Sequence, residues 1–221
     1  MITVHHLENS RSQRVLWLLE ELQLPYEVNR YARNPKTMLA PPELKAVHPL
    51  GKSPVITDGD VTVAESGLII DYLIDHYGQG QLKPAADTPE RLRYRYWLHY
   101  GEGSLMPLLV MKLIVGHMSK PPTPLLARPM AALVSWGLQR QFLTPQLKLH
   151  LDYVEAELGR SQWFVDDTLS GADILMSFPL EAASARAGGN YPRIKAFVER
   201  IQARPAYQKA LERGGPYQLL G

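Results

Sequence analysis

One stretch of the chain, from His48 to Tyr72, constrains the fold more than any other. It contains two short runs rich in β-branched residues, 54–57 and 61–63, and the Asp-Gly-Asp between them is typical of a hairpin turn. An apolar helical pattern follows directly after the second run. The stretch therefore predicts a loop, a strand, a tight turn, a second strand and a helix, in that order.

Two positions in this stretch suggest a binding site as well as a fold. Pro54 follows Ser53 at the mouth of a strand, where a proline removes a ladder donor and can adopt the cis isomer in a tight turn. Glu65 and Ser66 place a hydroxyl and free backbone N–H groups at a helix N-terminus, where carboxylates bind well, and Lys52 adds a cation. A capped helix after a hairpin explains the same residues without a ligand, because Ser66 can cap the helix by itself.

With the Glu-Ser pair at this distance from the Gly-Lys-Ser-Pro-Val loop, the sequence resembles the cytosolic glutathione S-transferases. The His-Pro-Leu-Gly motif before the proline resembles a bacterial and fungal branch with a serine-type site. In this family the proline is cis, the residue before it pairs through its main chain with the cysteinyl part of glutathione, and the Glu-Ser pair holds the γ-glutamyl end. A polar residue at the position of Lys52 reaches the glycine end. The resemblance thus implies a glutathione site made of Lys52, Ser53, Pro54, Glu65 and Ser66.

The composition limits the partners that this chain can have. Its 221 residues are 45% hydrophobic and 21% charged with a net charge of +2, as in an ordinary globular protein. That charge gives no basic field for nucleic acid or an anionic membrane, and no apolar run is long enough for a membrane span. The N-terminus has no signal-peptide layout, so we expect a cytoplasmic protein. Because cysteine is absent, a disulfide and a cysteine nucleophile are excluded, and a reacting sulfur must arrive on a ligand, here glutathione as co-substrate.

The first part of the chain alternates strand and helix patterns. Residues 2–5 and 26–31 are predicted strands on either side of a helix over 14–22, which makes a βαβ unit with a right-handed crossover. Adding the hairpin and its helix gives the order βαβ-ββα, the thioredoxin-like α/β arrangement that the resemblance also implies. A short helix is expected near 43–45 in the connection. We assign residues 1–80 to this glutathione-binding domain.

Beyond it the composition shifts to glycine, proline and polar residues, and then almost no strand pattern follows. We assign residues 81–88 to a linker and 89–221 to an all-helical domain that forms the electrophile pocket. Pro145 is expected at a kink or helix boundary. Ser170 and Asp173 fit a capping box that opens a buried helix, and we expect its role to be folding.

The end of the first predicted strand and the start of the first predicted helix form the place where a thiolate can be stabilised. A helix dipole and a hydroxyl donor both favour the anion, and one pKa unit is worth about 1.4 kcal/mol. Ser10 stands before Arg14 at the spacing by which serine-type relatives place their active hydroxyl, so the resemblance points to Ser10, with Asn9 and Ser12 as alternatives. Ser10 and Gln13 also fit a capping box, in which the hydroxyl proton of Ser10 is still free to donate.

Three histidines near this site have a simpler explanation than metal binding. His5 and His6 end the first predicted strand, but no carboxylate lies at metal-ligand spacing beside them. We expect both to be structural or to line a wall, and we expect His48 to pack within its loop. The sequence therefore predicts no metal site.

The second substrate is expected to be apolar and electrophilic, and to be held by the first helices of the second domain. Candidate wall residues, chosen because methionine and aromatic side chains make adaptable apolar surfaces, are Tyr100, Ser104, Leu105, Met106 and Leu109. For any single one of these residues, ordinary helix core is the favoured explanation.

The resemblance implies a homodimeric glutathione transferase. Bound glutathione would ionise, and its sulfur would attack an electrophilic carbon or a peroxide. Two alternatives stay open: glutathione-dependent reduction of peroxides or mixed disulfides without a protein cysteine, and a protein that binds glutathione without turnover.

Overall fold

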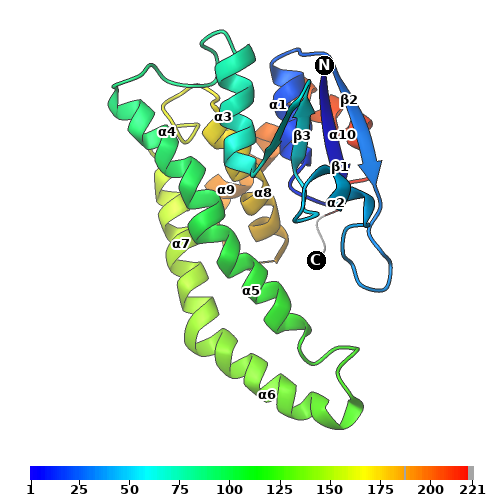
Figure 1. Ribbon diagram of the computed structural model, residues 1–221. Helices are drawn as coiled ribbons and strands as arrows, with labels where there is room; N and C mark the ends of the chain where they lie inside the picture. Colours follow the sequence, from blue (N-terminus) through cyan, green and yellow to red (C-terminus); the bar gives the residue numbers. More distant parts are fainter. Residues whose placement is uncertain (187, 219–221) are drawn as a thin grey trace.

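The computed structural model describes residues 1–186 and 188–218. Figure 1 shows an N-terminal part built around a small sheet and a helical part beside it, from which a long helical hairpin extends away. The predicted fold, a thioredoxin-like α/β domain followed by helices, is confirmed.

The N-terminal part contains a four-stranded mixed sheet. Its elements follow the predicted order: β1 (Ile2–Leu7), α1 (Gln13–Glu21), β2 (Tyr26–Tyr31), α2 (Glu43–Val47), β3 (Val55–Asp58), β4 (Val61–Ala64) and α3 (Ser66–Tyr77). The strand order is β2-β1-β3-β4, with β1 parallel to β2 and antiparallel to β3. Because His5 pairs with Val55, the carboxyl end of β1 lies beside the turn that leads into β3. The topology thus brings the head of α1 to the Ser53–Pro54 bond.

The second part is helical. Its elements are α4 (Pro89–Tyr100), η1 (Gly101–Leu105), α5 (Met106–His117), η2 (Leu125–Ala127), α6 (Arg128–Leu138), η3 (Gln139–Leu143), α7 (Thr144–Glu157), α8 (Gly171–Arg186), α9 (Pro192–Gln202) and α10 (Pro205–Gly214). No strand occurs in 89–186 or 188–218. Pro145 stands in the first turn of α7, directly after the π-helical turn η3, so it lies at a helix boundary as expected.

None of the helices in the described ranges has both the length and the apolar character needed to cross a bilayer. The cytoplasmic location expected from the sequence stays a prediction.

Helix α1 lies at the centre of the molecule. Every residue from Gln13 to Glu20 is buried, because α3, α8 and α10 all pack against this helix as well as the sheet. Its tryptophan, Trp17, is fully buried and meets the ring of Tyr207 in α10 edge to face at 5.5 Å. The polar side chains of α1 therefore have to find hydrogen-bond partners inside the protein.

Two π-helical turns, η1 and η3, interrupt the two long helices of the hairpin. Such turns are rare and often occur at functional sites. In η1, a Cβ added at Gly101 would lie 3.0 Å from the Leu175 side chain and 3.2 Å from the Met176 sulfur. The glycine thus permits close contact between η1 and α8, and the next residue, Glu102, comes to lie against the N-terminal part.

The start of α8 contains the predicted capping box in a modified form. The Asp173 carboxylate accepts the Ser170 N–H at 2.8 Å, as expected, and also the Phe164 N–H at 2.8 Å. The Ser170 hydroxyl, however, donates to the same carboxylate at 2.7 Å instead of accepting the Asp173 N–H. Both residues are buried, so the contacts serve folding, as predicted.

Candidate functional site

A cleft of about 260 Å³ lies where β3, α3 and η1 meet. Its lining residues are Arg11, His48, Leu50, Lys52, Ser53, Pro54, Val55, Ala64, Glu65, Ser66 and Glu102. All five residues predicted to bind glutathione are among them, and the Ser53–Pro54 bond is cis, as the resemblance implies. The structure therefore brings these five residues to one hollow; their contact with a ligand stays a prediction.

The start of α3 forms one wall of this cleft. Glu65 adopts a left-handed backbone conformation with φ of +73°, which is uncommon for a residue with a side chain and tends to occur at ligand sites. Ser66 follows as the first residue of α3 and is 4% exposed. Its Oγ accepts a hydrogen bond from Nη2 of Arg14 at 2.8 Å. Because arginine only donates, the hydroxyl proton of Ser66 is left for another acceptor, such as a ligand carboxylate.

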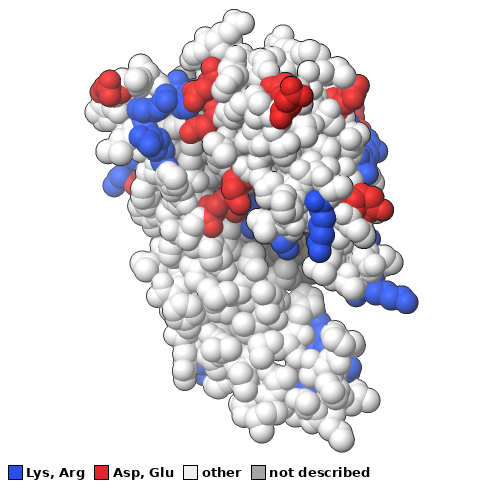
Figure 2. Space-filling model, viewed as in Figure 1, with Lys and Arg blue, Asp and Glu red and all other residues white. Residues whose placement is uncertain are grey.

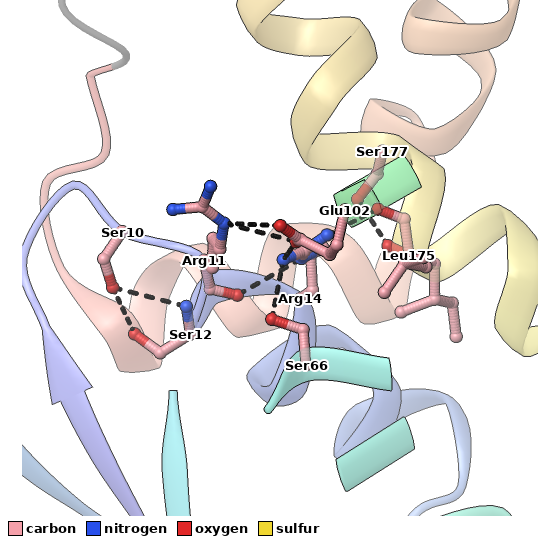
Figure 3. Close-up of polar contacts among 9 residues, drawn as sticks. Ser10, Arg11, Ser12, Arg14, Ser66, Glu102, Leu175 and Ser177 are labelled. Atoms are coloured by element: carbon pink, nitrogen blue, oxygen red, sulfur yellow. Dashed lines mark hydrogen bonds and ion pairs between the residues drawn. The ribbon is translucent and has the colours of Figure 1, made fainter. Parts of the chain in front are cut away.

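Arg14 joins the two parts of the molecule behind the cleft (Figure 3). Its buried guanidinium donates to the Leu175 carbonyl in α8 at 2.6 Å and to the Glu102 carboxylate at 2.5 Å, in addition to Ser66. Glu102 also accepts from Nε of Arg11, with distances of 3.0 and 3.2 Å to its two oxygens. A carboxylate of the helical part thus holds the arginine that orients Ser66 in the N-terminal part.

The charges in this network favour an ionised carboxylate. Burial by itself would raise the pKa of Glu102, but the positive charges of Arg14 and Arg11 and their hydrogen bonds outweigh it and hold that pKa below its usual range. Two guanidinium groups, Arg11 in the wall of the cleft and Arg14 behind it, therefore face one carboxylate.

The head of α1 differs from the prediction in one respect. The capping box of Ser10 and Gln13 is not formed, since α1 begins at Gln13 after Ser12 without a side-chain cap. The Ser10 Oγ instead accepts the Ser12 N–H at 3.3 Å, and the two hydroxyls lie 2.8 Å apart. The side chain of Gln13 is buried without a hydrogen-bond partner in the described part of the chain. The hydroxyl of Ser12, in turn, bonds Nδ1 of His6 at 2.8 Å.

None of the three residues predicted to contact the sulfur lines the cleft. Ser12 is fully buried and Ser10 is 5% exposed, although the Ser10 Oγ lies 3.4 Å from the Ser53 Oγ at the edge of the cleft. Asn9 is half-buried, and its side-chain oxygen accepts the Gln218 N–H at 2.7 Å. Contact of any of them with a sulfur stays a prediction.

The histidines of β1 are structural, as expected. His5 bonds the Tyr31 hydroxyl at 3.0 Å, and His6 bonds Ser12. Burial, with a smaller contribution from Arg30, lowers the pKa of His6 to about 4. His48 departs from the expectation of simple loop packing, because it lines the cleft and its Nδ1 is buried without a partner among the described residues. No group of three metal-ligating side chains occurs in the described ranges.

The residues predicted to form the electrophile pocket lie in two environments. Tyr100, Leu105, Met106 and Leu109 are buried in the main core, which corresponds to the simpler alternative of ordinary helix core. Tyr100 also bonds His150 at 2.8 Å. Ser104 in η1 is exposed. In this conformation only Ser104 of the five is open to a ligand, because the remaining side chains fill the contact between α4, α5 and α8.

The roles of Arg11, Arg14 and Glu102 were not predicted from the sequence. Arg14 served only as a marker of spacing, although a charged residue at the start of an otherwise apolar helix signals a buried partner. Glu102 lies between two glycines, a pattern that indicated only a loosened helix. The pairing of the two residues joins positions far apart in the chain, and no local pattern contains that information.

Comparisons with known proteins agree with the fold. Residues 10–76 match the glutathione S-transferase N-terminal domain, and residues 141–205 match the glutathione S-transferase C-terminal domain. Glutathione S-transferase 3 of Schizosaccharomyces pombe is 35% identical, with 96% of this chain and 88% of that protein covered. Glutathione S-transferase 1 of Saccharomyces cerevisiae is also 35% identical, with 96% and 95% covered.

Among solved structures, a glutathione S-transferase from Actinobacillus pleuropneumoniae is 36% identical, with a TM-score of 0.79 over 97% of this chain and 93% of that one. Sequence and structure thus agree over nearly the whole length. The chain belongs to the glutathione S-transferase family.

Proposed function

We propose that this protein is a glutathione transferase that keeps the sulfur of bound glutathione as a thiolate for attack on a hydrophobic electrophile. The observation that carries the proposal is the cleft, which gathers the cis-Pro54 turn, the Glu65–Ser66 helix start and Lys52 around one hollow. The absence of cysteine fits this chemistry, since the thiol must come with the ligand.

Each end of the tripeptide has a proposed partner. The γ-glutamyl carboxylate binds the hydroxyl of Ser66 and the free N–H groups of the α3 N-terminus, where the helix dipole also favours an anion. The cysteinyl main chain pairs with Ser53, and exposed Lys52 attracts the glycine carboxylate. The sulfur then lies toward the head of α1, beside the domain contact made by Glu102.

The electrophile is proposed to bind on the helical side of the sulfur, near exposed Ser104. A larger hollow of about 670 Å³ between α5, α6 and α7 shares no lining residue with the cleft. A group bound there would not touch the proposed position of the sulfur, so volume alone does not identify the second substrate site.

We also propose a homodimer. Helix α6 and the turn after it expose large apolar side chains, including Leu133, Trp136 and Phe142, which are 61%, 57% and 50% exposed. Isolated surfaces of this kind usually contact a partner. On the face shown in Figure 2, the extended hairpin carries basic but no acidic side chains. Two such hairpins would repel each other, so the hairpin of one copy is not expected to pack against the hairpin of the other. The N-terminal part of the second copy, which does carry carboxylates, is the proposed counterpart.

A turnover assay tests the proposed function. The purified protein is given glutathione and an aryl halide, and we expect a conjugation rate that saturates with both substrates. Replacing Lys52→Gln should raise the KM for glutathione several-fold with little change in kcat, because Lys52 contributes uniform binding.

The assay also distinguishes the alternatives. Consumption of a peroxide or mixed disulfide without conjugation would indicate a reductase. Binding of glutathione with no turnover of any electrophile tested would indicate a binding protein. No binding of glutathione by folded protein would contradict the proposal.

A further inference from the structure

We infer that Arg11, and not a hydroxyl at the head of α1, is the group that stabilises the thiolate; this inference rests on the proposed function. The observation is positional. Among the residues that line the cleft, Arg11 is the one contributed by the segment between β1 and α1, whereas Ser10 and Ser12 are buried behind it. The side chain of Arg11 is 32% exposed, so it reaches the cleft without being fully hydrated.

The proton of Ser10 is already used inside the protein. Burial holds the pKa of His6 well below its usual value, so the ring is neutral at pH 7 and has one bare nitrogen. Nδ1 of His6 lies 2.8 Å from the Ser12 Oγ, and with the ring proton on Nε2 this nitrogen accepts the Ser12 hydroxyl. The Ser12 oxygen then accepts the hydroxyl of Ser10 at 2.8 Å.

Each serine has a single hydroxyl hydrogen, so this chain of contacts leaves Ser10 without a donor for a ligand. Its remaining alternative acceptor inside the protein, the Ser53 Oγ, is farther away at 3.4 Å. A thiolate placed against Ser10 would face the lone pairs of the Ser10 oxygen, which repel an anion. The chain from Ser10 to His6 therefore fixes the head of α1 but does not stabilise an anion in the cleft.

Arg11 has the opposite arrangement. Its Nε is held by Glu102 and its guanidinium lies 5.4 Å from the centre of the Phe178 ring, which together fix the group. In the described part of the chain no hydrogen bond uses its two terminal nitrogens, and Figure 3 shows them directed away from Glu102. These N–H groups carry a permanent positive charge and are free to donate to a sulfur anion.

The carboxylate that faces Arg11 is shared with a second cation. Glu102 faces both Arg11 and Arg14, so one carboxylate serves two cations. Arg14 is fully buried and directed to Ser66, Glu102 and Leu175, and it is not among the residues lining the cleft. The other charged or titratable side chains of the lining are Lys52, Glu65 and His48, and beyond the lining Arg33 faces Arg11 from the β2 side together with its own counter-charge, Glu8.

The reaction then balances without a protein base. The bound thiol releases its proton to water and keeps the S–H electron pair, while Arg11 remains protonated throughout. The sulfur attacks the carbon of the aryl halide, the new S–C bond forms, and halide leaves with its bonding electrons. Arg11 lowers the pKa of the thiol and does not exchange a proton.

The test is the pKa of the enzyme-bound thiol, measured by the ultraviolet absorbance of the thiolate across pH. In Arg11→Gln we expect this pKa to rise by about one unit or more, which is at least a tenfold fall in the ionisation constant of the bound thiol. Arg11→Lys keeps the charge and should restore most of the shift. Exposed Arg95→Gln, which removes the same charge outside the cleft, should leave the thiol pKa unchanged.

Affinity for S-methylglutathione, which has no thiol proton, identifies where Arg11 acts. Arg11→Gln should change the affinity for S-methylglutathione by no more than about twofold, because Arg11 contacts the sulfur anion, which this ligand lacks. A thiol pKa that moves in Ser10→Ala but not in Arg11→Gln would overturn the inference, as would an equal loss of affinity for glutathione and its S-methyl form. Failure of the wild-type protein to bind glutathione would instead overturn the proposed function.

Discussion

Two helices of this protein begin with the same kind of residues but in opposite environments. At the start of α8, Asp173 and Ser170 satisfy each other and the Phe164 N–H, and the cluster is closed to solvent. At the start of α3, Ser66 is held from behind by Arg14, and its hydroxyl proton remains available on the side of the cleft. A serine beside a carboxylate at a helix start is thus compatible with a purely structural role and with a ligand site.

The two helix starts differ in the partners of their carboxylate and their serine. The carboxylate at α8 points back to its own helix start, so it uses every nearby donor. At α3 the corresponding carboxylate, Glu65, is exposed, and the serine instead meets a donor from another helix. Four changes in sequence or conditions test this contrast.

The largest expected effect is on the support behind the open helix start. Arg14→Met leaves Glu102 with one cation and removes the hydrogen bonds that Arg14 donates to Ser66 and to the Leu175 carbonyl. We therefore expect the free energy of unfolding to fall by about 3–5 kcal/mol. Denaturant titration measures this loss. Exposed Arg95→Gln is the control and should change stability by less than about 0.5 kcal/mol. A loss below about 1 kcal/mol in Arg14→Met would show that the network does not hold the two parts together.

A substitution at the closed start of α8 should lower stability without changing the affinity for glutathione. Asp173→Ala leaves three donors without their acceptor, and we expect a loss of about 2–3 kcal/mol in the free energy of unfolding. Calorimetric affinity for glutathione, measured where the variant is folded, should match the wild type. Weakened binding by folded Asp173→Ala would break the distinction between the two helix starts.

The two serines form a matched pair. Ser66→Ala should weaken glutathione binding about tenfold, since about 1.4 kcal/mol is the size of one hydrogen bond to a charged group. Ser170→Ala should lower stability by about 1 kcal/mol without changing affinity. Titration calorimetry and thermal unfolding of both variants give the two readouts, and a reversed pattern would contradict the assignment of an open and a closed start.

The smallest expected effect concerns the head of α1, which is closed through His6. Its pKa of about 4 in the folded protein lies below the usual value, so the unfolded chain binds more protons between pH 4 and 6.5. The contribution of His6 to stability is therefore fully present well above pH 6.5 and is lost as the pH falls, by about 1.4 kcal/mol at pH 5.5. In His6→Asn the slope over this range should be smaller, and an unchanged slope would mean that another group titrates.

Much of the fold was accessible from the sequence. The β-branched runs at 54–57 and 61–63, with a turn between them, contain their own pairing information, and the observed strands differ by about one residue at each end. The strand over 26–31 matches its prediction. Alternating and helical patterns are local properties, so they survive into the folded chain.

The site was accessible only in part. The cis-proline turn and the Glu65–Ser66 pair are local motifs, and they were found. The pairing of Arg14 with Glu102 depends on η1 packing against α8, which no local pattern encodes. The capping box at Ser10 was locally plausible but was not formed: α1 begins at Gln13, and the Ser12 hydroxyl bonds His6 of the preceding strand. Competition between distant partners explains these misses.

The most direct test of the account is a calorimetric titration of the wild-type protein with glutathione and, separately, with cysteinylglycine, which lacks the γ-glutamyl group. If the start of α3 holds that group, glutathione should bind with a Kd of about 1 mM or tighter and the dipeptide at least about tenfold more weakly. Equal affinity for the two peptides, or no binding of glutathione by folded protein, would contradict the account.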